Sequence, residues 1–170
     1  MKQIFVGLFI FLLSLSTGNI YAQTPTPSSE FNFQRAYQDF VFTFDQYKLA
    51  ESAYELARAQ YLQSKTLASK AKAQEATYKL LQARDEVVKT HFTALRQRIA
   101  ESVGISQDRK EVLYQKIDIE VEWYNKHKQS SSSAASLEDL VIDSKLASDR
   151  YRIITESIAY EITSEIAIGK

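Results

Sequence analysis

Two histidines, His91 and His127, are the side chains of this sequence best suited to proton transfer or metal binding near neutral pH. His91 falls between Val88 and Leu95 on an apolar helical face, which favours a structural place in the core. His127 stands between two lysines near the expected end of a helix, so we expect it on the surface, where cations suit the helix dipole. Because no His-x-x-x-His or Glu-x-x-His pattern accompanies either ring, we expect no metal site.

The remaining polar groups lack the arrangements that catalysis and cofactor binding require. The chain has no cysteine, and its four glycines are too scattered for a phosphate-binding loop. Serines fall in linkers and helix caps rather than at a nucleophile elbow. We therefore expect no catalytic activity and no cofactor. Carboxylates with the spacing of a solvated helix face include Asp39, Asp45, Glu51 and Glu55.

The charges of the chain are balanced, with 21 lysines and arginines against 21 aspartates and glutamates. Nucleic-acid-binding domains are normally basic, so we expect no nucleic-acid partner. Without cysteine, an exported chain of this kind must be held together by packing alone.

The first 22 residues have the layout of a secretory signal peptide. Lys2 gives a positive start, residues 4–15 form an apolar run, and Ala22 supplies a small residue for cleavage. The run is shorter than the roughly 20 residues that a membrane-spanning helix needs. We expect cleavage after Ala22 and export to the cell envelope, the periplasm or the extracellular space. An uncleaved N-terminal anchor is the alternative.

Helices are expected along most of the chain after a Pro/Ser/Thr linker at 23–29. Residues 31–103 contain neither proline nor glycine and are rich in helix formers. They form either one helix of about 70 residues or two helices that break near 63–69. We favour the break, because so long a pattern without caps is unusual outside coiled coils.

Two further helix starts are marked by Ser106 and by the capping-box pattern of Ser136 and Asp139, which follows a serine-rich linker at 129–135. Residues 117–123 alternate as a strand would, but the sequence offers no second strand to pair with them. We expect an all-α antiparallel bundle of about four long, coiled-coil-like helices, in one domain over 30–168. The expected helices are 30–64, 67–103, 107–128 and 137–168.

The first of these helices carries a regular repeat of large and small side chains. An aromatic residue recurs at every seventh position, and a small residue follows each one three positions later. This spacing places both sets on one side of a helix, as in a coiled coil. We expect this side to be an intramolecular packing seam against another helix. The seam residues are Phe33, Phe40, Tyr47, Ala50, Tyr54, Ala57, Tyr61 and Ser64.

The start of the same helix, residues 31–47, holds more apolar residues than one core-facing stripe can bury. One interpretation is that this helix runs through the middle of the bundle. The other is an exposed apolar patch for a partner helix, a second copy or a membrane surface. The candidate interaction residues are Phe31, Tyr37, Phe42 and Phe44.

Several stretches resemble uncharacterised exported helical proteins of bacteria. They are the Tyr-x-Leu-Ala heptads, Leu81-Gln-Ala-Arg-Asp-Glu-Val87, Trp123-Tyr-Asn-Lys-His-Lys128 and Ser136-Leu-Glu-Asp-Leu-Val141. The resemblance spans most of the chain after the leader, and it brings no catalytic or binding residues. The long helical hairpins are also weakly similar to those of outer-membrane efflux ducts.

We expect an exported, non-catalytic protein that acts through helix–helix or protein–protein contact, as a scaffold, an adaptor or an envelope component. Its partner would be another protein or a second copy, and contact with a membrane surface is also open. One alternative is a periplasmic coiled-coil hairpin of an envelope or efflux-like assembly, which an unbroken helix over 31–103 would favour. The other is a small ligand-binding bundle or enzyme, which a buried cluster of His91 with carboxylates from other helices would favour.

Overall fold

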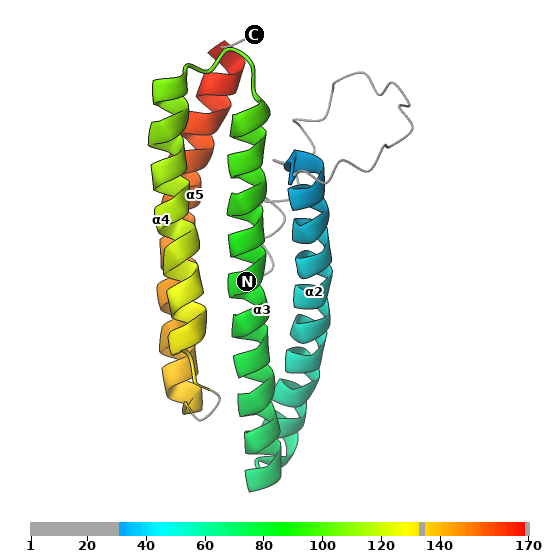
Figure 1. Ribbon diagram of the computed structural model, residues 1–170. Coiled ribbons are helices and arrows are strands. Elements are labelled where there is room, and N and C mark those ends of the chain that lie inside the picture. Colours follow the sequence, from blue (N-terminus) through cyan, green and yellow to red (C-terminus); the bar gives the residue numbers. More distant parts are fainter. Residues whose placement is uncertain (1–30, 133–134, 169–170) are drawn as a thin grey trace, which may run out of the picture. The chain divides into compact units, whose positions relative to one another are not determined.

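The computed structural model describes residues 31–132 and 135–168, and the residues from 31 onward form one compact unit. Its elements are all helices, and successive helices run antiparallel (Figure 1). They are α2 (Phe33–Ser64), α3 (Leu67–Glu101), α4 (Gln107–Ser130) and α5 (Leu137–Ile168). The prediction of an all-α bundle of about four helices is thus confirmed. None of the described helices is long and apolar enough to cross a membrane.

The chain turns between α2 and α3 within two residues. Lys65 adopts a left-handed conformation with φ 45°, and its backbone N–H donates to the carbonyl of Tyr61. Thr66 then caps α3: its hydroxyl accepts from the Ser69 N–H at 3.1 Å, and the Ser69 hydroxyl accepts from the Thr66 N–H at 3.0 Å. Residues 31–103 are therefore divided between two helices and do not form one unbroken helix.

Local capping explains where the other helices begin and end. α2 begins at Phe33 rather than near residue 30, because the Asn32 side chain accepts the Arg35 N–H at 3.0 Å. The predicted capping box of α5 is present, since the Asp139 N–H donates to the Ser136 hydroxyl at 3.1 Å and the Ser136 N–H donates back to the Asp139 carboxylate. The predicted leader, its cleavage site and the linker at 23–29 lie outside the described residues.

Two helix ends differ from the predicted ones. α3 ends at Glu101, and Gly104 follows with φ 95°, a conformation that glycine adopts without steric cost. α4 continues to Ser130, into the stretch predicted as a linker, and Ser131 closes it by donating its N–H to the His127 carbonyl. Residues 117–123 lie inside this helix, so their alternation does not produce a strand.

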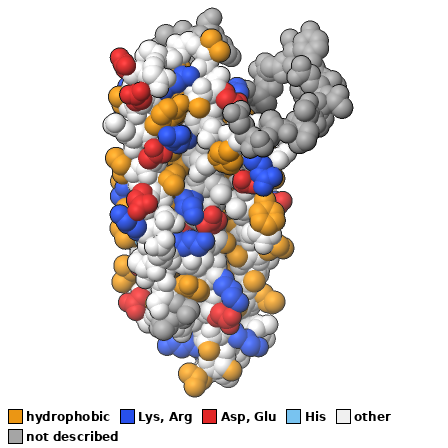
Figure 2. Space-filling model, viewed as in Figure 1, with side chains coloured by type: hydrophobic (Ala, Val, Ile, Leu, Met, Phe, Trp, Pro, Cys, Tyr) orange, Lys and Arg blue, Asp and Glu red, His pale blue; other side chains and the backbone are white. Residues whose placement is uncertain are grey.

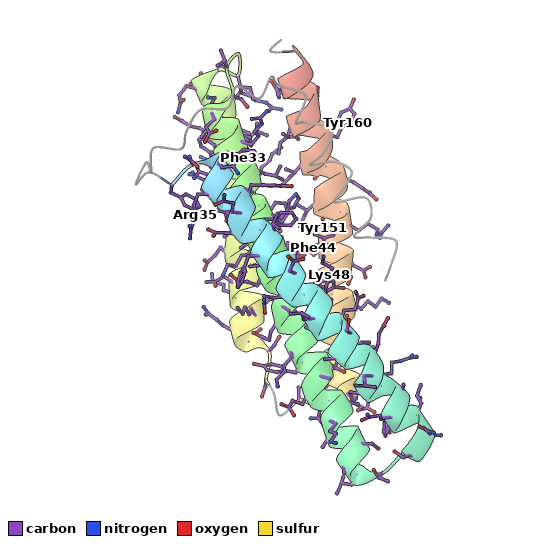
Figure 3. The ribbon with its side chains drawn as sticks, turned by 90° about the vertical axis from the view of Figure 1, so that its right-hand side faces the viewer. Phe33, Arg35, Phe44, Lys48, Tyr151 and Tyr160 are labelled. Carbon is purple, nitrogen blue, oxygen red and sulfur yellow. The ribbon has the colours of Figure 1, made fainter. Side chains whose placement is uncertain are left out.

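α3 is the helix around which the others pack. It contacts α2, α4 and α5, whereas α2 has close backbone contacts with α3 alone. Figure 3 accordingly shows α2 on the outside of the unit, in front of α3. The interpretation that the first helix runs through the middle of the bundle is therefore wrong. The core residues of α3 include Leu80, Leu81, Val87, Val88, Phe92, Ala94, Leu95 and Ile99.

Candidate functional site

The predicted seam of α2 faces α3 along most of its length. Two threonines, Thr43 and Thr90, join the helices across the seam, with their hydroxyl oxygens 2.7 Å apart. Ser64 is exposed, because it belongs to the last turn before the chain reverses and its hydroxyl bonds back to Gln60. Of the other seam residues, Phe40, Tyr47 and Ala57 are buried, and Phe33, Ala50, Tyr54 and Tyr61 are partly buried.

Enlarging the buried small residue of the seam should destabilise the protein. Ala57→Leu adds three carbons to a packed contact between α2 and α3, and overpacking of this kind typically costs about 1–3 kcal/mol. Ala53, one turn earlier, is exposed, so Ala53→Leu should leave the free energy of unfolding nearly unchanged. Urea denaturation of both variants measures the difference. Equal stability of the two would show that the seam is not packed.

The candidate interaction residues at the start of α2 divide into two groups. Phe31 and Phe42 are exposed, whereas Tyr37 and Phe44 are partly buried and belong to a ladder of neighbouring rings. The ring centroids along this ladder are 5.8–6.4 Å apart, and the Lys48 ammonium covers Phe44 at 4.9 Å (Figure 3). The ladder consists of Phe33, Tyr37, Phe40, Phe44 and Tyr47.

An exposed apolar stripe runs along the outer face of α2, and we call it the outer stripe. Its members Phe42, Leu49 and Leu56 recur every seven residues and are 65%, 66% and 63% exposed. The space-filling view shows apolar side chains at the surface among the charges (Figure 2). In each Tyr-x-Leu-Ala repeat the leucine lies two positions after the tyrosine, about 200° around the helix. The repeat therefore makes an inner seam and an outer stripe at once. The sequence predicted the inner seam and one member of the outer stripe, Phe42, but not Leu49 and Leu56.

A buried polar cluster joins α3 to α4 and α5. At its centre Asp85 is fully buried, with one carboxylate oxygen 2.6 Å from Nδ1 of His127 and the other 3.4 Å from the Arg84 guanidinium. Arg84 in turn donates to the carbonyl and the hydroxyl of Ser144 on α5, both at 3.1 Å. The cluster thereby links three helices: Asp85 joins α3 to α4, and Arg84 joins α3 to α5.

The burial of His127 corrects the prediction that it lies on the surface. It is only 8% exposed, because α4 continues past it and its position extends the buried face that carries Ile117, Glu120 and Tyr124. The neighbouring lysine, Lys128, does point outward, and its ammonium bonds to Glu86 at 2.8 Å. The signal for an inward His127 was therefore present in the three- and four-residue spacing along α4.

The chemistry open to the Asp85–His127 pair is limited by its enclosure. Oδ2 of Asp85 and Nδ1 of His127 share one hydrogen bond, at 2.6 Å. This is the orienting half of a catalytic triad. However, Nε2 is buried without a hydrogen-bond partner among the described residues, and Trp123 stacks on the ring at 4.8 Å. Among the described residues, then, no nucleophile is hydrogen-bonded to this pair, and no group of three metal-ligating side chains is present.

A second ion pair lies beside this cluster, between α4 and α5. Arg150 binds both oxygens of the Glu120 carboxylate, at 2.7 and 2.9 Å, and its guanidinium lies 4.6 Å from the Trp123 ring centroid. In this bidentate geometry the Arg150 guanidinium and the Glu120 carboxylate neutralise each other. An open groove of about 420 Å³ adjoins them and is lined by Glu120, Trp123, Leu146, Asp149, Arg150, Ile153 and Ile154.

His91 occupies an apolar place between α2 and α3. Its ring centroid lies 5.4 Å from that of Phe40 and 5.7 Å from that of Phe92, and burial lowers its pKa to about 4. Both ring nitrogens are buried and have no hydrogen-bond partner among the described residues. The predicted structural place of His91 agrees with this geometry. No carboxylate among the described residues forms a hydrogen bond or an ion pair with its ring.

The fold and these sites define the class of the protein: a helical bundle with a long α2–α3 hairpin, a buried polar cluster and an apolar outer face on α2. No protein-family model matches the chain, and neither a curated protein nor a solved structure matches it.

Proposed function

We propose that this is an exported, non-catalytic helical protein that works through helix–helix contact, as a scaffold, an adaptor or an envelope component. The observation that carries the proposal is the outer stripe of α2. Three large apolar side chains at heptad spacing on one exposed face are the pattern by which a helix docks along another helix. Scattered apolar residues would not have this periodicity.

Small side chains between the large residues of the outer stripe would allow a second helix to approach α2 closely. Ser52, Ala53 and Ala59 are exposed around Leu49 and Leu56, so this part of α2 has small side chains where a second helix would cross. The inner seam packs against α3 with the same alternation of large and small residues. A partner helix, in the simplest case α2 of a second copy, would therefore meet the outer stripe by the geometry that α3 already uses on the inner side.

Two other functions have partial support in the fold. A coiled-coil hairpin of an envelope assembly is supported by the length of α2 and α3. However, the chain reverses direction at Lys65, so the two helices are not one unbroken helix. A ligand-binding bundle or an enzyme has less support, since His91 meets no carboxylate among the described residues and the Asp85–His127 pair is enclosed.

Light scattering of residues 23–170 over a range of concentrations tests the outer stripe. We expect the mass of the wild type to rise with concentration and that of Leu49→Glu/Leu56→Glu to stay monomeric, because a charge in a packed apolar contact is costly. Circular dichroism should show both proteins equally helical, since the two leucines are exposed.

The matched control is Leu146→Glu/Ile153→Glu on α5, which places the same charges at the same spacing on another exposed face. This control should assemble like the wild type. The chain has no cysteine, so Leu49→Cys supplies a unique thiol that should form a disulfide between copies under oxidising conditions. A wild type that stays monomeric at every concentration, or assembly unchanged by the stripe substitutions, would contradict self-association through this face.

A further inference from the structure

The end of the α2–α3 hairpin, residues 58–72, is a surface distinct from the outer stripe, and we call it the hairpin tip. It holds the last turns of α2, the connection at Lys65 and Thr66, and the first turns of α3. The connection between α4 and α5 meets α3 at Gln74, whose side-chain amide donates to the Ala135 carbonyl. The hairpin tip continues past that level (Figure 1).

The hairpin tip carries positive charge without counter-charge. Residues 56–74 include four cations and no carboxylate. These four side chains are exposed and form no ion pair among the described residues, whereas most lysines and arginines elsewhere in the described part of the chain pair with a carboxylate. The four cations are Arg58, Lys65, Lys70 and Lys72.

Large apolar side chains accompany these cations. Leu67, the first residue of α3, is 85% exposed, and Leu62 on α2 is 55% exposed. Between the two helices lies a hollow of about 270 Å³ lined by Lys72 and by uncharged residues such as Gln60 and Gln63. The end of the hairpin thus combines cations, leucines and neutral hydrogen-bonding groups and has no carboxylate.

We propose that the hairpin tip docks end-on to an anionic phospholipid surface. Lysines and arginines are attracted to anionic headgroups, and exposed leucines gain by entering the boundary between headgroups and acyl chains. α2 contributes Arg58 and Leu62, the connection contributes Lys65, and α3 contributes Leu67, Lys70 and Lys72. The cations therefore come from both helices and from the connection between them, and they do not form a stripe along one helix. This arrangement fits a plane met end-on better than a second helix, which would lie along a side. The membrane contact is independent of the outer stripe.

Flotation of residues 23–170, which contain the whole compact unit, with lipid vesicles tests the hairpin tip. We expect binding to vesicles that contain phosphatidylglycerol, little binding to pure phosphatidylcholine, and loss of binding at high salt. Each cation near such a surface contributes roughly fivefold in affinity, so Lys65→Gln/Lys70→Gln should weaken binding about 20-fold to 30-fold. Leu67→Gln should also weaken binding, and it leaves the net charge unchanged.

The matched control is Lys145→Gln/Arg152→Gln, which removes from α5 two exposed cations that form no ion pair with the described residues and changes the net charge equally. It should bind like the wild type. An equal loss in this control, or equal binding to the two kinds of vesicle, overturns the proposal. Absence of binding to anionic vesicles at low salt also overturns it, and favours an acidic protein surface as the partner. Neither result depends on self-association, which light scattering reports separately.

Discussion

Replacing Asp85 with alanine is expected to lower the free energy of unfolding by about 3–5 kcal/mol, because it removes the carboxylate that contacts both the buried Arg84 guanidinium and the buried His127 ring. The Arg84 guanidinium and the His127 ring would remain buried without a carboxylate partner. Arg84 would keep its bonds to Ser144, which cannot neutralise its charge. Urea denaturation, compared with the wild type, measures the loss.

An exposed ion pair provides the control for this substitution. Asp118 binds Arg96 at 2.9 Å, and both side chains are exposed, so Asp118→Ala should cost less than about 1 kcal/mol. The double variant Asp85→Leu/His127→Leu should recover part of the loss of Asp85→Ala, because two apolar side chains can replace a buried polar pair. Similar small losses for Asp85→Ala and Asp118→Ala would contradict the buried polar cluster.

The polar cluster also bears on how α3 and α4 are aligned. One turn of α3 makes three successive contacts with α4: Gln82 donates to the Lys128 carbonyl at 2.9 Å, Asp85 bonds to His127, and Glu86 accepts from the Lys128 ammonium. A shift of either helix by one turn would separate all three and leave the buried Asp85 carboxylate without its histidine partner. We infer that the cluster selects one alignment of the helices, which apolar contacts alone specify less strictly.

Much of the fold could be predicted because its signals are local. The end of α2, the capping of α3 by Thr66 and the capping box at Ser136 depend on side chains within four residues of each other. The seam of α2 could be predicted because its period is a property of one helix. The predicted starts of α3, α4 and α5 differ little from the structure for the same reason.

The sites were harder to predict because they depend on which helices meet. Asp85 stands in an ordinary Arg-Asp-Glu run, and its partner His127 is 42 residues further along the chain. α2 is apolar on two sides: the repeat of aromatic and small residues marks the side that α3 covers, but the leucines on the opposite side carry no comparable signal for what covers them. Phe42 was predicted as an interaction residue, whereas Leu49 and Leu56 were not, although both belong to the predicted repeat.

Acidification should destabilise the protein through His91. Its pKa is lowered to about 4 by burial, while the pKa of a histidine in the unfolded chain is about 6.5. Above about pH 6.5 the ring is neutral in both states and has no effect. Between about pH 6.5 and 4 the unfolded chain binds a proton that the folded protein excludes, so the free energy of unfolding decreases as the pH is lowered. The expected loss is about 2 kcal/mol by pH 5 and about 3 kcal/mol by pH 4.

Carboxylates also titrate in this pH range, and the variant His91→Phe separates the contribution of His91 from theirs. Phenylalanine fills the place between Phe40 and Phe92 without a titratable ring, and the nitrogens it removes have no hydrogen-bond partner among the described residues. The stability difference between the variant and the wild type, measured by urea denaturation from pH 7 to pH 5, should therefore grow by about 2 kcal/mol in favour of the variant. Titration of the His91 ring by NMR should give a pKa well below 6.5 in the folded protein. If the stability difference between the variant and the wild type did not change with pH, the His91 ring would be accessible to solvent. That result would contradict the burial of His91 between α2 and α3.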